Sequence, residues 1–168
     1  DDTSGTDGDV TIHGGTTALV LGLSTIEGDL ALTSTATGDD KITNTGTLNI
    51  RGTTTVSAIG VNVELNSAAN NFEGVVSING VDVTVVDRND IEFTTSNITG
   101  AFDLTAGGGV TDSGRLTIKD DTNINASSGN VVLNEGTNDF QKAVKIIGVN
   151  VTLVDTNAID LGASTVGG

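Results

Sequence analysis

The chain has 168 residues, which is long enough for one ordinary domain with a sizeable core. Its formal net charge of −15 argues against nucleic-acid partners and membrane insertion, because nucleic acids and anionic membrane surfaces bind basic patches and no apolar run approaches the length of a membrane span. No cysteine is present, so a disulfide framework and a thiolate metal site are both excluded.

Many short strands are predicted from the first residues to the last. The chain is rich in Thr, Val and Ile, which suit strands, and in Gly, Asn and Asp, which suit turns. Apolar residues two positions apart alternate with polar ones, which is typical of a strand with one buried face. Such pairs include Val10/Ile12, Leu19/Leu21, Leu30/Leu32, Leu48/Ile50, Val63/Leu65, Phe102/Leu104, Leu116/Ile118 and Val131/Leu133.

An internal repeat organises these strands. The stretch 72–93, FEGVVSINGVDVTVVDRNDIEF, returns without a gap 68 positions later as 140–161, FQKAVKIIGVNVTLVDTNAIDL, with half of its residues identical. We divide the chain, treated as one domain over 1–168, into a partial copy 1–47, a full copy 48–115 and a partial copy 116–168. Such self-similarity indicates a repeat architecture.

The repeat predicts an all-β fold, a parallel β-solenoid. We count nine short strands between residues 48 and 115, which makes three coils of about 23 residues with three strands each, and about seven coils in the whole chain. Equivalent apolar residues would then lie above one another as internal ladders. The expected ladder residues are Val76, Ile78, Val83, Val85, Ile91, Phe93, Val144, Ile146, Val151, Leu153, Ile159 and Leu161.

The first copy differs by an insertion. The stretch 28–46 matches 100–114 only if four residues are added around TSTATGDD, which we place in a surface turn. The stretch 18–28, ALVLGLSTIEG, resembles 158–168, AIDLGASTVGG, so the chain begins and ends near the same point of the repeat. We therefore expect a segment of a longer array.

The strands GAFDLTAGG and SGRLTIKD, with the turns NNF and TNDF followed by GVNVTLVD and AIDLGAST, resemble the repetitive stalk of filamentous-haemagglutinin-type adhesins. These are large bacterial exoproteins secreted by the two-partner route. The resemblance implies a right-handed parallel β-helix, an extracellular or cell-surface location, and a role in adhesion or as a rigid spacer. It carries over no binding residue.

Four acidic residues at the start, Asp1, Asp2, Asp7 and Asp9, could offer oxygen ligands to calcium. Their spacing matches neither an EF-hand loop nor the glycine-rich nonapeptide repeat, so we favour a solvated terminus. Calcium is the one cofactor that the sequence leaves open.

Asn and Asp recur at equal places in the two copies. A periodic ligand array and a set of turn residues both fit them, and we favour turns because these side chains hydrogen-bond nearby backbone. The residues are Asn70, Asp87 and Asn89 in one copy and Asn138, Asp155 and Asn157 in the next.

Some β-helix proteins cleave acidic polysaccharides, so we considered an enzyme. The candidate acids are Asp82, Asp87, Asp90 and Glu92, with Arg88 as the nearby positively charged residue. No spacing singles out an acid and base pair among them, and the negative charge of the chain would repel an acidic polymer. The lone histidine, His13, gives little support to a catalytic triad and is assigned to the surface.

Two other patterns have structural explanations. The glycines 107–109 precede a strand and not a helix, which favours a tight corner over a phosphate cradle. The triplet Thr53–Thr55 is not repeated at residues 121–123, which argues against an ice-binding threonine array. The four Phe residues fall at inward positions and are expected in the core.

The sequence therefore predicts a non-enzymatic structural segment of a secreted surface fibre or adhesin. Its expected partners are neighbouring repeats, identical subunits stacked end to end, or a surface glycan or protein receptor. A polysaccharide-active or calcium-dependent module is the alternative. Any recognition surface should lie where the copies differ, as at Arg88 against Thr156 and Glu73 against Gln141.

Overall fold

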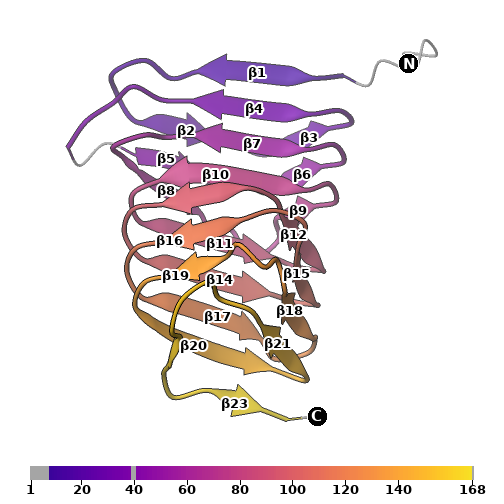
Figure 1. Ribbon diagram of the computed structural model, residues 1–168. Helices are drawn as coiled ribbons and strands as arrows, with labels where there is room; N and C mark the ends of the chain where they lie inside the picture. Colours follow the sequence, from indigo (N-terminus) through magenta and orange to yellow (C-terminus); the bar gives the residue numbers. More distant parts are fainter. Residues whose placement is uncertain (1–7, 39–40, 168) are drawn as a thin grey trace.

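The chain forms an all-β parallel solenoid of about eight turns, with three strands in each coil (Figure 1). This is a computed structural model, and it describes residues 8–38 and 41–167. The coils stack along one axis, with β1 at one end and β23 at the other. No helix in the described part of the chain is long and apolar enough to cross a membrane.

The strands are short and follow one another around the coil. They are β1 (Val10–His13), β2 (Leu19–Leu21), β3 (Ser24–Ile26), β4 (Leu30–Thr33), β5 (Lys41–Asn44), β6 (Leu48–Ile50), β7 (Thr54–Ser57), β8 (Asn62–Leu65), β9 (Asn71–Phe72), β10 (Val76–Gly80), β11 (Val83–Asp87), β12 (Ile91–Phe93), β13 (Ser96–Ile98), β14 (Phe102–Ala106), β15 (Val110–Asp112), β16 (Leu116–Ile118), β17 (Thr122–Ala126), β18 (Val131–Leu133), β19 (Asp139–Phe140), β20 (Ala143–Gly148), β21 (Val151–Leu153), β22 (Asp160–Leu161) and β23 (Thr165–Val166).

Strands that are three apart in the chain lie on the same face in successive coils and pair in parallel, as β1 does with β4 and β4 with β7. The second face is one continuous sheet, β2-β5-β8-β11-β14-β17-β20, and the third face begins as β3-β6-β9. The first face, β1-β4-β7-β10, divides after β10, because β10 pairs with β12 through Val76 and Phe93 and with β13 through Gly80 and Ile98. One branch continues as β12-β15-β18-β21 and the other as β13-β16-β19.

The core follows from the alternation of apolar and polar residues along each strand. Inward residues of successive coils lie in register, as where Val83 pairs with Phe102 and Val85 with Leu104. The ring of Phe93 meets that of Phe102 edge to face with centroids 5.4 Å apart, and all four Phe are buried. Eight of the expected ladder residues are fully buried: Val76, Ile78, Val83, Val85, Ile91, Phe93, Val144 and Ile146.

The last ladder residues differ from the expectation. Val151 and Leu153 are only partly buried, and Ile159 and Leu161 are exposed. The reason is their position, since β21, β22 and β23 have a described strand on one side only. These four side chains occupy the same inward positions as their equivalents in the earlier copy, but no described coil covers them.

The repeat contains ten strands, and not the nine counted in the sequence. The pairing of Val76 with Phe93 recurs as Val144 with Leu161, which identifies β4–β13 and β14–β23 as equivalent sets. Ten strands make three and one-third coils, so each copy is turned by one face relative to the copy before it. Accordingly, β7 lies in the first sheet, whereas the equivalent β17 lies in the second.

Candidate functional site

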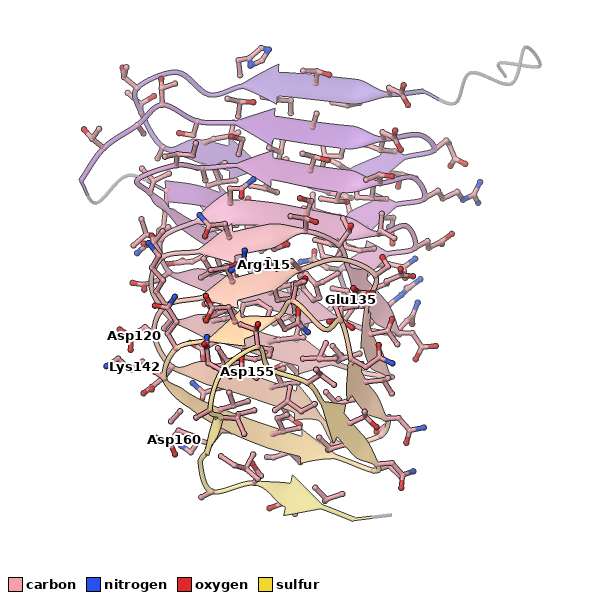
Figure 2. All side chains as sticks on the ribbon, viewed as in Figure 1. Arg115, Asp120, Glu135, Lys142, Asp155 and Asp160 are labelled. Carbon is pink, nitrogen blue, oxygen red and sulfur yellow. The ribbon has the colours of Figure 1, made fainter. Side chains whose placement is uncertain are left out.

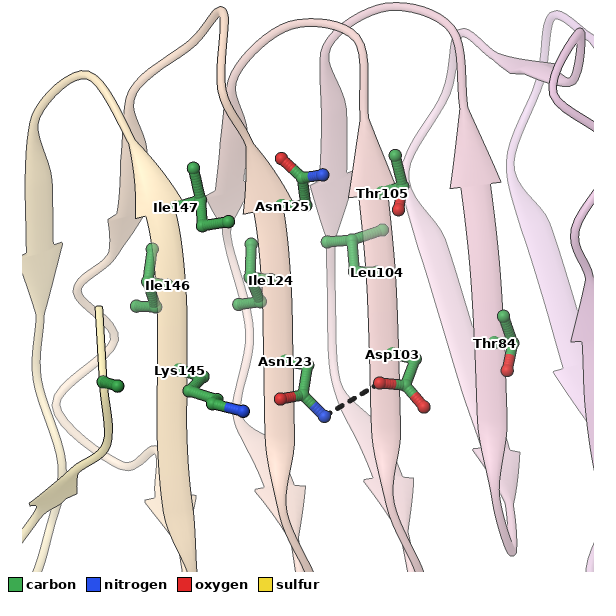
Figure 3. A pocket seen from close by; sticks show the side chains of 11 residues that line it. Thr84, Asp103, Leu104, Thr105, Asn123, Ile124, Asn125, Lys145, Ile146 and Ile147 are labelled. Atoms are coloured by element: carbon green, nitrogen blue, oxygen red, sulfur yellow. Dashed lines mark hydrogen bonds between the residues drawn. The ribbon is translucent and has the colours of Figure 1, made fainter. Parts of the chain in front are cut away.

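A shallow groove of about 290 Å³ runs across the outer side of the second face, over strands β11, β14, β17 and β20 (Figure 3). Its floor is sheet backbone, and outward side chains form its walls. The lining residues are Thr84, Asp103, Leu104, Thr105, Asn123, Ile124, Asn125, Lys145, Ile146, Ile147 and Ala163.

One row of polar side chains crosses this groove along the solenoid axis. Strand pairing places Thr84 beside Asp103, Asp103 beside Asn123, and Asn123 beside Lys145. The Asn123 amide Nδ2 donates to Asp103 Oδ1 at 2.9 Å, which holds the middle of the row (Figure 3). Neighbouring strands are about 4.8 Å apart, so the row offers one hydrogen-bonding group per coil.

The part of the groove on β20 differs from the equivalent strand of the earlier copy. On β20 the inward residues Val144 and Ile146 are the same as on β10, but the outward Lys145 and Ile147 replace Ser77 and Asn79. Inward positions are fixed by packing, whereas outward positions are free to vary. The groove is therefore a surface on which one copy differs from the other.

A second hollow, of about 600 Å³, lies over β9, β12, β15 and β18 and is acidic. Glu73, Asp90 and Glu92 line it together with backbone from Gly108 and Gly109. Asp90 Oδ1 accepts the backbone N–H of Gly109 at 2.6 Å, so this carboxylate joins two successive coils. Glu73 Oε1 accepts a hydrogen bond from the Asn71 amide at 2.9 Å, which ties this carboxylate to its own connection.

The remaining candidate catalytic residues lie elsewhere. Asp82 Oδ1 accepts the N–H of Ala101 at 2.9 Å at the corner before β11. Asp87 is buried, and its carboxylate accepts the N–H groups of Phe72 at 3.0 Å and Asn89 at 3.2 Å. Burial raises the pKa of the Asp87 carboxyl, and these N–H groups and Arg88 oppose that rise. The fold thus separates Asp82 and Asp87 from the acidic hollow.

The recurring corner residues bind the coils together. Asn70 is fully buried; its Oδ1 accepts the N–H of Leu48 at 3.0 Å, and its Nδ2 donates to the carbonyl of Leu65 at 3.1 Å. In the next copy Asn138 accepts from Leu116 in the same way, at 2.8 Å. Asp155 accepts the N–H of Phe140 at 3.0 Å, which matches Asp87 and Phe72.

A related contact explains much of the Asp and Asn content and was not predicted. A side chain just before or at the start of a strand accepts the N–H at the same corner of the next coil. The pairs are Asp9 with Asp29, Asp29 with Thr53, Asn62 with Asp82, Asp82 with Ala101, Asp90 with Gly109, and Asn130 with Asn150. The signal in the sequence is an Asp or Asn that repeatedly precedes an apolar pair.

The calcium candidates fall mostly outside the described residues. This is true of Asp1, Asp2 and Asp7, whereas Asp9 forms one of the inter-coil contacts just described. Within residues 8–38 and 41–167, no three His, Cys, Asp or Glu side chains gather as a metal site would require.

The remaining candidate residues, which include His13 and the glycines 107–109, lie at the surface or at corners of the coil. The side chain of His13 is exposed on β1. The glycines 107–109 form the corner between β14 and β15, with their N–H groups bonded to the preceding coil. Thr54 and Thr55 begin β7 of the first sheet, whereas the equivalent residues 122 and 123 lie on β17 of the second, so they form no common array.

Most charged side chains lie on the outside of the coils (Figure 2), although Asp87 is buried. Lys41 pairs with Glu64 at 2.7 Å, Arg115 with Asp139 at 3.4 Å, and Arg51 with Glu27, all across neighbouring coils. These pairs are partly or largely exposed, so each contributes at most about 1 kcal/mol to stability. Their arrangement nevertheless adds to the contacts along the solenoid axis.

A model of a protein family described as repeats of unknown function (DUF5649) matches the sequence twice, over residues 7–79 and 80–147. The two matches together cover most of the chain. The comparisons found no matching curated protein and no matching solved structure.

Proposed function

We propose that this chain, which belongs to the family of repeats of unknown function DUF5649, is a structural segment of a secreted bacterial surface fibre or adhesin. In this role it is a rigid stalk that carries no catalytic activity and extends other parts of the molecule from the cell. The resemblance of its strands to the stalks of filamentous-haemagglutinin-type adhesins supports the extracellular location.

The observation that best supports this proposal is that each coil packs on the next without interruption. Apolar side chains, backbone pairing and buried Asn and Asp contacts join each coil to the next, from β1 to β21. A solenoid built in this way is stabilised by nearest-neighbour contacts and lengthens by the addition of equivalent coils. Such construction suits a spacer, in which length and stiffness matter more than one enclosed site.

The outer surface fits a solvent-exposed fibre. Acidic residues outnumber basic ones 22 to 7, so separate molecules repel one another along their sides. Glycine, Asn and Asp at the corners let the chain turn tightly without long loops. At Gly74, for example, a side chain would collide with the backbone of Gly52 in the preceding coil.

Localisation can be tested with antibodies raised against this chain and applied to intact cells of its source organism. The proposal expects labelling without permeabilisation and loss of the label after external protease treatment. Labelling that requires permeabilisation contradicts it. Deletion of residues 48–115 from the natural protein should shorten the fibre by three and one-third coils, or about 16 Å, which averaged electron micrographs can measure.

A second candidate function is binding of an extended polar polymer, such as a neutral glycan, in the groove of the second face. The row Thr84, Asp103, Asn123 and Lys145 favours it, since one hydrogen-bonding group per coil suits a ligand that lies along the axis. The four Phe side chains are buried, so binding would depend on hydrogen bonds and not on stacking.

A glycan array provides the test of groove binding. The double variant Lys145→Ser and Ile147→Asn gives this part of the groove the outward residues of the full copy 48–115, Ser77 and Asn79, and leaves the inward residues unchanged. The proposal expects retention of a glycan by the wild type and its loss in the double variant. Equal retention by both proteins assigns binding to another surface.

A further inference from the structure

The outer side of β20 carries positive charge on a strongly acidic protein. Residues 140–154, which include β20 and β21, contain Lys142 and Lys145 and no Asp or Glu. Both lysine side chains are exposed, and within the described part of the chain neither forms an ion pair. Since the whole chain has 22 acidic and 7 basic residues, this stretch is a local exception to its charge.

The equivalent stretch of the earlier copy has the opposite charge. Residues 72–86 contain two acids and no Lys or Arg, so the formal charge changes from −2 there to +2 in residues 140–154. The inward Val and Ile of β10 and β20 are the same in both copies, so packing of the core does not require this change. The replacements are Glu73 by Gln141, Gly74 by Lys142, Ser77 by Lys145 and Asp82 by Asn150.

Lys145 brings the positive charge into the groove of the second face. It lies at one end of the polar row that crosses the groove, and its side chain points along the row toward Asn123 (Figure 3). On the other side of Asn123 lies Asp103, which accepts the Asn123 amide hydrogen bond at 2.9 Å. The backbones of Asp103 and Lys145 are two strand spacings apart, or about 10 Å. The groove therefore has a positive end and a negative end.

We propose that the groove binds a glycan that carries a single carboxylate, and that Lys145 binds this carboxylate. The inference rests on groove binding, the second candidate function above, and specifies the charge of the ligand. The Lys145 ammonium has three N–H donors, and hydrogen bonds from a charged donor to a carboxylate are among the stronger ones. Asn123 and Asp103 offer the donor and acceptors that sugar hydroxyl groups need. Ile147, with an exposed fraction of 44%, gives a sugar ring an apolar surface on the same strand.

The acidic surroundings restrict the ligand to one carboxylate. A polymer with a carboxylate on every sugar would place further carboxylates along the row, where Asp103 lies about 10 Å from Lys145. Like charges that face one another across an interface weaken binding, and the net charge of −15 repels a polyanion as a whole. A neutral glycan would gain nothing from the charge of Lys145. A ligand with a single acid group fits both ends of the groove.

Two oligosaccharides that differ in one group test the role of this charge in isothermal titration calorimetry. The first ends in one glucuronic acid, and in the second that carboxyl group is reduced to the alcohol. The wild type should bind the acid form about fivefold more tightly, and Lys145→Gln should remove the difference. Arg88→Gln is the matched control, because it removes one positive charge from an exposed corner outside the groove and should keep the preference.

Polygalacturonate tests the negative end of the groove. The wild type should bind it more weakly than the single-acid oligosaccharide, and Asp103→Asn, which keeps an oxygen acceptor for Asn123, should gain affinity for it. Tighter binding of the polymer by the wild type overturns the restriction to one acid group.

Two results overturn the role of Lys145: equal binding of the acid and alcohol forms by the wild type, or a preference that survives in Lys145→Gln. If the two forms bind equally and the double variant Lys145→Ser and Ile147→Asn loses both, groove binding stands and only the charge assignment fails. Binding of neither form contradicts groove binding itself. Surface labelling of cells decides the rod function separately.

Discussion

Replacement of the buried Asn70 by alanine tests whether polar side chains hold the coils together. Asn70 accepts hydrogen bonds from the N–H of Leu48 at 3.0 Å and from Nδ2 of Asn44 at 2.9 Å, and it donates to the carbonyl of Leu65 at 3.1 Å. Its side chain has no exposed surface. Alanine would therefore leave buried donor and acceptor groups without these partners.

The magnitude follows from those groups. An unsatisfied buried donor or acceptor costs about 1–3 kcal/mol. Counting mainly the N–H of Leu48 and the carbonyl of Leu65, we expect Asn70→Ala to lower the free energy of unfolding by about 2–5 kcal/mol. That is a large part of the total stability of an ordinary domain, about 5–15 kcal/mol.

Urea denaturation followed by far-ultraviolet circular dichroism measures the change, since the chain has no Trp or Tyr to serve as a fluorescent probe. The matched control is Asn66→Ala, an exposed Asn in the same connection between β8 and β9, for which we expect a change within about 0.5 kcal/mol. Equal losses in the two variants would refute the reasoning.

Three further predictions concern packing and charge. Gly129→Ala should destabilise the fold by about 1–3 kcal/mol in urea titrations, because its methyl group would meet the backbone of Gly108, whereas Gly136→Ala has open space and should change little. Ile78→Ala should lower the free energy of unfolding by about 2–5 kcal/mol and its outward neighbour Asn79→Ala by less than about 0.5 kcal/mol, and similar losses would contradict the inward assignment. Burial raises the pKa of Asp87 above 3.8, so the folded chain holds this proton more tightly than the unfolded chain. Wild-type stability relative to Asp87→Asn should therefore fall as pH rises from about 4 toward neutrality, and a difference that is constant or rises with pH would contradict the burial effect.

The inward residues of the fold could be predicted from the sequence, because packing and strand alternation leave a pattern of period two. Val76, Ile78, Val83 and Val85 illustrate this, since each is buried at the expected phase. The surface insertion was also readable, and it falls in the connection between β4 and β5.

The number of strands could not be predicted correctly, because β9 is too short to show an alternation of apolar and polar residues. It consists only of Asn71 and Phe72, and its position depends on side-chain contacts from Asn70 and Asp87 in neighbouring parts of the coil. In the sequence these residues look like a turn. With that strand included, the repeat has ten strands, which changes the face on which every equivalent residue lies.

The groove could not be predicted, because it depends on which outward residues come into register across four coils. Asp103, Asn123 and Lys145 are about 20 residues apart, and nothing local distinguishes them from other outward side chains. The differing positions named from the sequence, Arg88 against Thr156 and Glu73 against Gln141, do not line this groove.

The central claim is that the repeat builds a continuous three-faced rod and turns by one face per copy. Paired spin labels can test it directly in the cysteine-free chain, with one pair at Thr84 and Lys145 and another at Ser77 and Lys145. The account predicts the short distance for Thr84 and Lys145, whose backbones are three strand spacings apart on one sheet, or about 14 Å. Ser77 lies on another face and should be clearly farther from Lys145. The opposite order, with Ser77 as the close partner, would contradict the account, because it would place equivalent residues of the two copies directly above one another.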